Sequence, residues 1–196
     1  MRIIANQIVN IMMRKSLFIF FLTASLSASQ LMAQELPFSD ISKTEIDFST
    51  GNVVARMVEG LGFRYYWATE GLNKNDLAYK ASETGRSSMQ TVDHIYGLST
   101  FFLNFIQVEP IEVNDKSDFN ELRKSTLLNL EKAVTKLKSM EEDDFKDYTQ
   151  GQLTFWQMIN GPVADALWHT GQVVMMRRAS GNPLPKGVNV LMGVKN

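Results

Sequence analysis

The residues of this chain best suited to chemistry are one aspartate and two histidines. Asp165 and His169 are four positions apart in a segment with helical periodicity, so a helix places them on one face, one turn apart. His94, the other histidine of the chain, lies in a second segment with a helical pattern. Two imidazoles and one carboxylate suit a divalent transition metal with open positions for water or substrate. The three residues form such a site only if the fold brings the two helices together.

The same residues also allow a purely structural interpretation, in which Asp165 orients His169 within one helix. Other kinds of site are excluded by the sequence. It has no Glu-x-x-His pair of the di-iron bundles, no His-Glu-x-x-His pattern, no Gly-rich phosphate loop and no Gly-x-Ser-x-Gly elbow. The absence of cysteine excludes thiolate metal sites and a cysteine nucleophile.

The overall composition is that of a globular protein. Hydrophobic residues make up 44% and charged residues 21% of the 196 residues, and the formal net charge is -1. Nucleic-acid-binding proteins usually carry a basic excess or stripe, so we expect no nucleic-acid partner.

The N-terminus has the pattern of a secretory signal peptide. A short basic segment, Arg14 and Lys15, precedes an apolar run at 17–26, and small or polar residues follow up to Ala33. The pattern predicts a signal peptide at 1–33, cleavage after Ala33, and a periplasmic or extracellular protein. The apolar run is shorter than the roughly 20 residues of a membrane span, so we expect no stable membrane insertion after cleavage. An uncleaved anchor is the alternative.

The remaining residues, 34–196, suffice for one hydrophobic core and predict a single all-α domain, a four-helix bundle. Helices are expected over 51–72, 88–107, 118–140 and 162–179, and 141–144 is expected to be a solvated acidic loop. Hydrophobic spacing predicts the inward faces. In the last helix the residues expected to face the core are Val163, Leu167, Val174 and Met175.

Local residues predict where these helices begin and end. Ser49 or Thr50 and the Ser87-Ser88 pair are candidate N-caps, and Asp118 with Glu121 resembles a capping box. Pro162 suits a helix start or a kink, and Gly181 suits a left-handed C-terminal cap. On the third helix, we expect Arg123 and the lysines at 124, 132, 136 and 138 to form a solvated face.

Two segments resemble the DinB-like (DinB/YfiT-like) superfamily of metal-dependent helical bundles. Family members carry a histidine on the second helix, often in a Ser-[apolar]-x-x-x-x-His context, and a His-x-x-x-His-[Arg]-Gly-Gln run on the last helix. Residues 88–95 (SMQTVDHI) match the first pattern and 165–172 (DALWHTGQ) match the second. The turn at 85–87 and residues 67–72 are also similar to the family, so the resemblance covers essentially all of 34–196.

The resemblance implies a single divalent metal ion (zinc, manganese, iron or nickel) held by His94, Asp165 and His169. Asp165 stands where the family usually has histidine, and Thr170 stands where many members have arginine. The implied function is a metal-dependent enzyme, hydrolase-like or thiol-transferase-like, acting on an unknown small molecule, and the family implies a homodimer. Export favours hydrolysis over thiol transfer, because an exported protein is separated from the thiols of the cytosol. The alternative is a non-catalytic metal- or ligand-binding bundle with a degenerate site.

Several neighbouring residues carry weaker expectations. Gln172 lies about one turn after His169 and is expected to orient its ring without binding the metal itself. Glu70 is a candidate general base, although a surface role is the simpler interpretation. Trp168 is expected in the core, and Gly171 is expected to permit a close helix contact.

Overall fold

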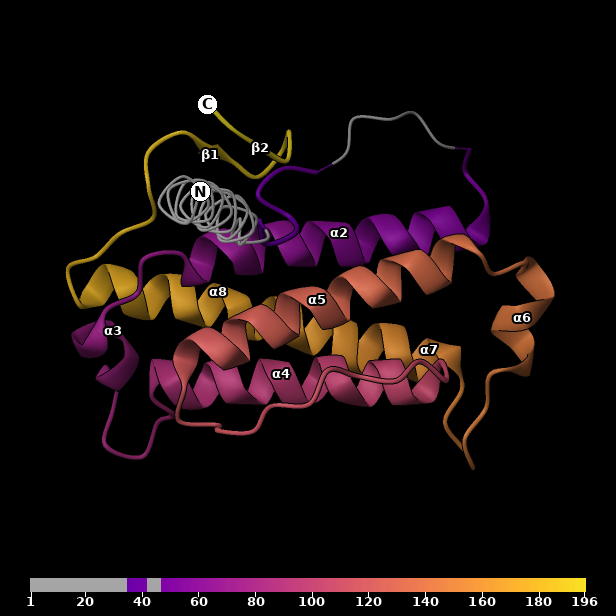
Figure 1. Cartoon of the computed structure of the whole chain (residues 1–196), viewed down its shortest axis with the longest axis horizontal. Helices are drawn as coiled ribbons and strands as arrows, with labels where there is room; N and C mark the ends of the chain where they lie inside the picture. Colours follow the sequence, from indigo (N-terminus) through magenta and orange to yellow (C-terminus); the bar gives the residue numbers. More distant parts are fainter. Residues whose placement is uncertain (1–34, 42–46) are drawn as a thin grey trace, which may run out of the picture. The chain divides into compact units, whose positions relative to one another are not determined.

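The computed structural model describes residues 35–41 and 47–196, and its regular structure is almost entirely helical (Figure 1). The predicted signal peptide at 1–33 lies outside the described residues, and the chain from Leu36 onward forms one compact unit. The long helices are α2 (Thr50–Thr69), α4 (Ser88–Phe105), α5 (Phe119–Lys138) and α8 (Ala164–Ala179). They correspond to the four segments predicted from periodicity, which confirms the all-α fold class.

Shorter elements connect and follow these helices. They are α3 (Lys74–Ala78), α6 (Glu142–Asp147), α7 (Phe155–Met158), the π-helical turn η1 (Ile159–Val163), and the antiparallel strands β1 (Val188–Asn189) and β2 (Val194–Lys195). The prediction of an acidic loop at 141–144 was wrong, because α6 begins there. Its acidic first turn complements the positive end of the helix dipole.

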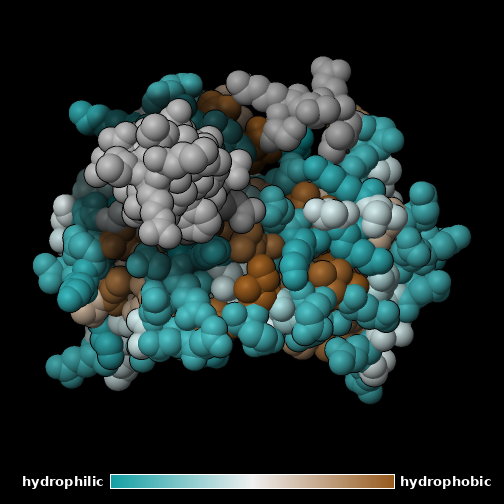
Figure 2. All heavy atoms as spheres, in the orientation of Figure 1, coloured by the Kyte–Doolittle hydropathy of each residue, from teal (hydrophilic) through white to brown (hydrophobic). Residues whose placement is uncertain are grey.

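The long helices pack so that α2 and α4 each contact both α5 and α8 (Figure 1). Their shared core contains fully buried apolar side chains from the different helices, among them Val58, Ile95, Leu122 and Val173. On the face shown in Figure 2, hydrophilic residues dominate and hydrophobic ones appear as separate patches. The packing of α4 against α8 is the contact that matters for the predicted site.

Hydroxyl and carboxylate caps begin the helices as predicted. The Ser49 side chain accepts a hydrogen bond from the Asn52 backbone N–H, and Ser87 forms a reciprocal capping box with Gln90. Asp118 caps α5, but Glu121 does not complete the predicted box. Its carboxylate instead accepts from backbone N–H groups of the preceding loop.

Of the two alternatives predicted for Pro162, a helix start or a kink, the start was wrong, because the last long helix continues from α7 through a π-helical turn. Pro162 lies inside η1, and the Ala164 N–H reaches back five residues to the carbonyl of Ile159. Proline lacks an N–H and crowds the preceding turn of an α-helix, and a wider π turn accommodates it. Asp165 therefore lies in the first turn of α8, directly after this irregularity.

The predicted inward face of α8 was wrong for two of its residues. Leu167 is 44% and Met175 63% exposed, whereas the buried positions include Ala166, Thr170 and Val173. The buried residues of α8 are Ala166, Thr170, Val173, Met176 and Arg177, so neither size nor hydrophobicity by itself marks the inner face. As a result, several large apolar side chains of α8 lie at the surface.

The prediction of a fully solvated face on α5 was also wrong at one position. Arg123 is buried and donates to the Thr69 hydroxyl and to the Glu70 carboxylate at the C-terminal end of α2. The sequence pattern predicted the same solvent exposure for Arg123 as for the neighbouring lysines. Its long stem and forked head instead join α5 to α2.

Candidate metal centre

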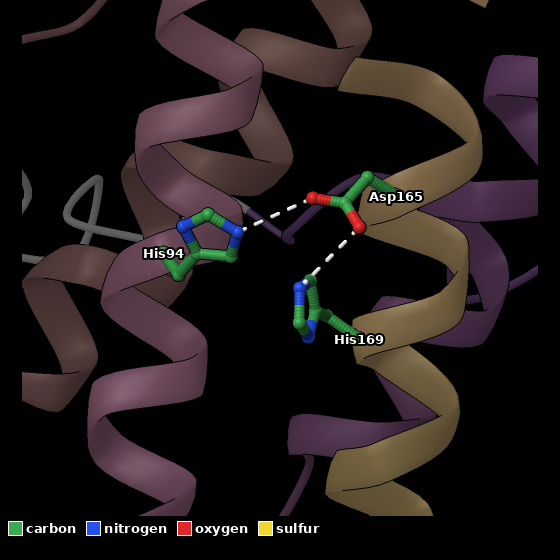
Figure 3. Close-up of side chains that lie close together, drawn as sticks. All are labelled: His94, Asp165 and His169. Atoms are coloured by element: carbon green, nitrogen blue, oxygen red, sulfur yellow. Dashed lines mark hydrogen bonds and ion pairs between the residues drawn. The ribbon is translucent and has the colours of Figure 1, made fainter. Parts of the chain in front are cut away.

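His94 from α4 and Asp165 and His169 from α8 converge, and their side chains point toward one another (Figure 3). One donor atom from each residue lies within 4.8 Å of the donors of the other two. His94 Nε2 is 3.3 Å from Asp165 Oδ2, and His169 Nε2 is 3.4 Å from Asp165 Oδ1. The two imidazole rings meet edge to face, with centroids 4.6 Å apart. The structure thus brings together all three residues singled out from the sequence, as a group that could hold a metal ion.

Each residue of the group is positioned by a buried neighbour on its own helix. Ile95 follows His94 and is fully buried, and Ala166 follows Asp165 in the same way on α8. Consecutive helical residues point about 100° apart, so the residue beside a core position lies at the edge of the helix contact. The three polar side chains therefore border the contact between α4 and α8 without being sealed inside it.

Gln172 orients His169, as the spacing predicted. His169 Nδ1 is 2.8 Å from Gln172 Oε1, three residues further along α8. An amide oxygen only accepts, so this contact fits the tautomer in which Nδ1 donates and Nε2 of a neutral ring keeps its lone pair. That lone pair faces a carboxylate oxygen of Asp165. Two acceptors in this arrangement are stabilised by a cation between them.

The His94–Asp165 contact is itself a hydrogen bond, and both separations, which end on the two different oxygens of Asp165, are also close to those of donors around a shared ion. N–H···O bonds have a typical donor–acceptor distance of about 2.9–3.0 Å. Donors held at about 2.1 Å from a tetrahedral ion lie about 3.4 Å apart. The two separations of 3.3 and 3.4 Å match the second value. Two nitrogen donors and one carboxylate are also an ordinary ligand set for zinc or iron.

The group is open to solvent on one side. The side chains of His94 and Asp165 are 31% and 41% exposed, and that of His169 is 14% exposed. A groove of about 700 Å³ borders His169, with Gln172 and Trp168 also in its lining. Water or a small molecule can therefore reach this side of the group.

Other expectations around the site were only partly right. Trp168 is 72% exposed and lies in the groove, so its assignment to the core was wrong. Gly171 makes no close helix contact, because a Cβ built there meets nothing within 4 Å. Glu70 forms an ion pair with Arg123. Arg86 and Met175 also line the groove, and no pattern in the sequence marked them as part of one surface.

Comparisons of the chain with protein-family models, with curated proteins and with solved structures found no match. Across residues 35–41 and 47–196, none of the helices combines the length and apolar character needed to cross a bilayer.

Proposed function

We propose that this chain is an exported DinB-like protein in which His94, Asp165 and His169 hold one divalent metal ion. In this proposal α2, α4, α5 and α8 form the family's four-helix bundle, and the site serves a metal-dependent enzyme. The observation that carries the proposal is the convergence of three donor atoms from two helices within 4.8 Å. The Gln172 contact that directs His169 Nε2 into the group supports it further.

The protein's own residues would have separate tasks in such a centre. The two imidazoles would bind the ion from opposite helices, and the Asp165 carboxylate would offset its charge. Zinc, manganese, iron and nickel all suit this mixed set of nitrogen and oxygen donors. When bound, the ion would supply Lewis acidity and lower the pKa of a coordinated water. The exposed side of the group and the adjacent groove would admit a substrate.

Among the two reactions implied by the resemblance, we favour hydrolysis. Water is available wherever the protein is exported, whereas a thiol transfer needs a small thiol as second substrate. A site open to solvent on one side suits a reaction that consumes water.

The second candidate is a bundle that binds a metal or ligand without catalysis. The observation that favours it concerns Glu70, the candidate base, whose carboxylate is paired with Arg123. A general base must lie within hydrogen-bond reach of the group that it deprotonates. In this alternative, Asp165 in place of the family's histidine marks a site that has lost its reaction.

Metal content of the purified chain tests the centre directly. After reconstitution with zinc, manganese, iron(II) or nickel and removal of excess ion, we expect about one equivalent of at least one metal per chain by elemental analysis. His169→Ala should abolish this binding. Asp93→Ala is the matched control, because it removes a carboxylate next to His94 that is not part of the converging group. Failure of all four metals to bind, or unchanged binding by His169→Ala, would overturn the metal proposal.

Catalysis is tested with the loaded protein. A panel of ester, amide and thiol-transfer substrates should yield a turnover that disappears in His169→Ala and persists in Asp93→Ala. Metal binding without any turnover across this panel would favour the non-catalytic candidate.

Export and assembly are tested separately. If the segment 1–33 is a cleaved signal peptide, the mass of the protein recovered from outside the cytoplasm should correspond to a chain that begins at Gln34. Light scattering should give the mass of the homodimer that the resemblance implies. A protein retained in the cytoplasm at full length would contradict export and leave the metal centre to be judged on its own test.

A further inference from the structure

The groove beside His169 has two walls of different character. One wall comes from the turn before α4 and includes Arg86, and the other is the outer side of α8. Of the three candidate ligands, His169 lines this groove. Whatever occupies the groove therefore lies next to the proposed metal centre.

The α8 wall carries large exposed apolar side chains beside the polar His169 and Gln172. Trp168 and Met175 are 72% and 63% exposed, although both are large hydrophobic residues. Gly171 lies between them along the helix, and a Cβ there would meet only open space. Glycine in the middle of a helix lowers its stability relative to alanine. At position 171 the missing side chain leaves the groove open. Exposed apolar surface around a concave site is typical of small-molecule binding.

The opposite wall supplies the positive charge of Arg86. Arg86 is exposed, and among residues 35–41 and 47–196 no hydrogen bond or ion pair engages its guanidinium. A guanidinium presents a planar fork of donors that matches the two oxygens of a carboxylate or phosphate. The groove thus offers an oxyanion contact on one side and an apolar surface on the other.

We propose that this groove binds a small organic anion, with its carboxylate or phosphate on Arg86 and its apolar body against Trp168 and Met175. Binding of the anion needs no metal. Only its role as a substrate rests on the proposed metal centre. The substrate class is therefore an amphipathic acid or phosphate ester whose remaining polar bond lies beside His169. A neutral molecule of the same shape binds more weakly, because it leaves Arg86 without a partner.

Three probes of matched shape test this assignment: 4-phenylbutyrate, 4-phenylbutyl phosphate and the neutral 4-phenylbutanamide. Binding is followed through the indole N–H resonance of Trp168, assigned by its loss in Trp168→Phe. We expect at least one anion to bind about tenfold more tightly than the amide, as a charge-assisted contact would give. The ratio between carboxylate and phosphate identifies which oxyanion the groove prefers.

Two pairs of variants locate the contact. Arg86→Gln should reduce anion affinity to the level of the amide and leave amide affinity unchanged, whereas Arg178→Gln, another exposed arginine near the end of α8, should change neither. Gly171→Leu should fill the groove and weaken all three probes. Gly97→Leu is its control, because Gly97 is also helical and open but does not line the groove.

The outcomes separate this inference from the proposed function. Equal affinity for anions and amide, or unchanged anion binding by Arg86→Gln, would overturn the groove assignment whatever the metal content. Arg86→Gln should bind metal like the unmodified chain. If no metal binds but anion binding still depends on Arg86, the groove assignment stands and the metal centre fails.

Discussion

Helix α8 carries two polar clusters, one in its first turns and one in its last, and they differ in how their polar atoms are satisfied. The last-turn cluster, which we call the Arg177 cluster, consists of Arg177, Ser180 and Asn182 together with Asp76 from α3. Arg177 donates at 2.7 Å to the Asn182 carbonyl and at 2.9 Å to the Trp67 carbonyl, and its exposed fraction is 1%. The Asn182 amide donates to Asp76 at 2.6 Å. With a longer contact of 3.3 Å from Arg177 to the Asn182 side chain, these are all contacts between protein groups.

The metal-centre cluster at the other end of the helix is joined by fewer contacts among its three members, one hydrogen bond and one ion pair. Its imidazole–carboxylate separations are 3.3 and 3.4 Å, and two of its side chains are about a third or more exposed. Buried polar groups in stable proteins are satisfied by protein partners. The Arg177 cluster meets this condition and stabilises the join between α2, α3 and α8. The metal-centre cluster is open to solvent on one side, where a further partner can bind.

The largest effect is expected from Arg177→Met. The substitution leaves the carbonyls of Trp67 and Ala68 without a donor and Asp76 without its nearby positive charge. Losing one partner of a buried charged group costs about 3 kcal/mol or more of unfolding free energy. Urea denaturation measures this, with Arg178→Met as control, since that neighbour is exposed and should cost about 0.5 kcal/mol or less. Equal losses for the two arginines would contradict the structural role of the Arg177 cluster.

Adding metal should raise the unfolding free energy through the metal-centre cluster and not through the Arg177 cluster. At a free metal concentration one hundred times the dissociation constant, binding should raise the unfolding free energy by about 2.7 kcal/mol. His169→Ala should abolish the gain while changing metal-free stability by about 1 kcal/mol or less, because the one short contact that it loses, to Gln172, is exposed. Thermal unfolding with and without the ion provides the comparison. A large loss of metal-free stability in His169→Ala would mean that the cluster is structural after all.

Asp76 should make stability sensitive to acid. Burial by itself would raise the pKa of Asp76, but contacts from the Asn73 backbone, Ser180 and Asn182 and the charge of Arg177 together lower it. A carboxyl whose folded pKa is depressed stabilises the fold fully above its unfolded pKa, about 3.9, and loses that contribution as the pH falls through the folded value. Asp76→Asn should cost about 1–3 kcal/mol at neutral pH and flatten the acid limb below pH 4. Stability measured from pH 7 to pH 2 tests this.

His169→Ala serves as the control for that titration, because it should leave the acid limb in place. An acid limb that persists unchanged in Asp76→Asn would assign the pH dependence to other carboxyls.

The smallest effect is expected from the glycines within α4 and α8. Gly171→Ala and Gly97→Ala should each raise the unfolding free energy by about 0.5–1 kcal/mol, since both positions are helical and a Cβ meets nothing nearby. Thermal unfolding of the two variants checks the values. A loss of stability in Gly171→Ala alone would show that this side of α8 is covered in solution.

Much of the helical architecture could be predicted because its determinants are local. Ser49 and Ser87 cap the helices that they were expected to cap, and Gly181 ends α8 with a left-handed backbone, φ 93°. A cap depends on residues within one turn, so a sequence window contains all the information it needs. Whether His94 joins Asp165 and His169 was left open by the sequence, and the structure brings the three together.

The surroundings of the candidate site could not be predicted in the same way. Leu167, Trp168 and Met175 were assigned to the core and lie at the surface, while Arg177, a charged residue in the last turn, is buried. Hydrophobicity gives each residue a preference for burial, but the partner helix decides which side of α8 is covered. Here the buried positions Ala166, Thr170, Val173 and Met176 alternate with the large exposed residues Leu167 and Met175, so hydrophobicity alone did not identify the covered side.

The sequence by itself determined that Asp165 and His169 share one face of a helix, because four residues span about one helical turn. It also determined where that helix ends, through Gly181. Only the tertiary structure decided that His94, 71 residues before Asp165, comes within 3.3 Å of it. It likewise decided that the apolar residues beside His169 face a groove. Contacts between distant segments depend on how whole helices pack, and packing is set by the complete core rather than by any one segment.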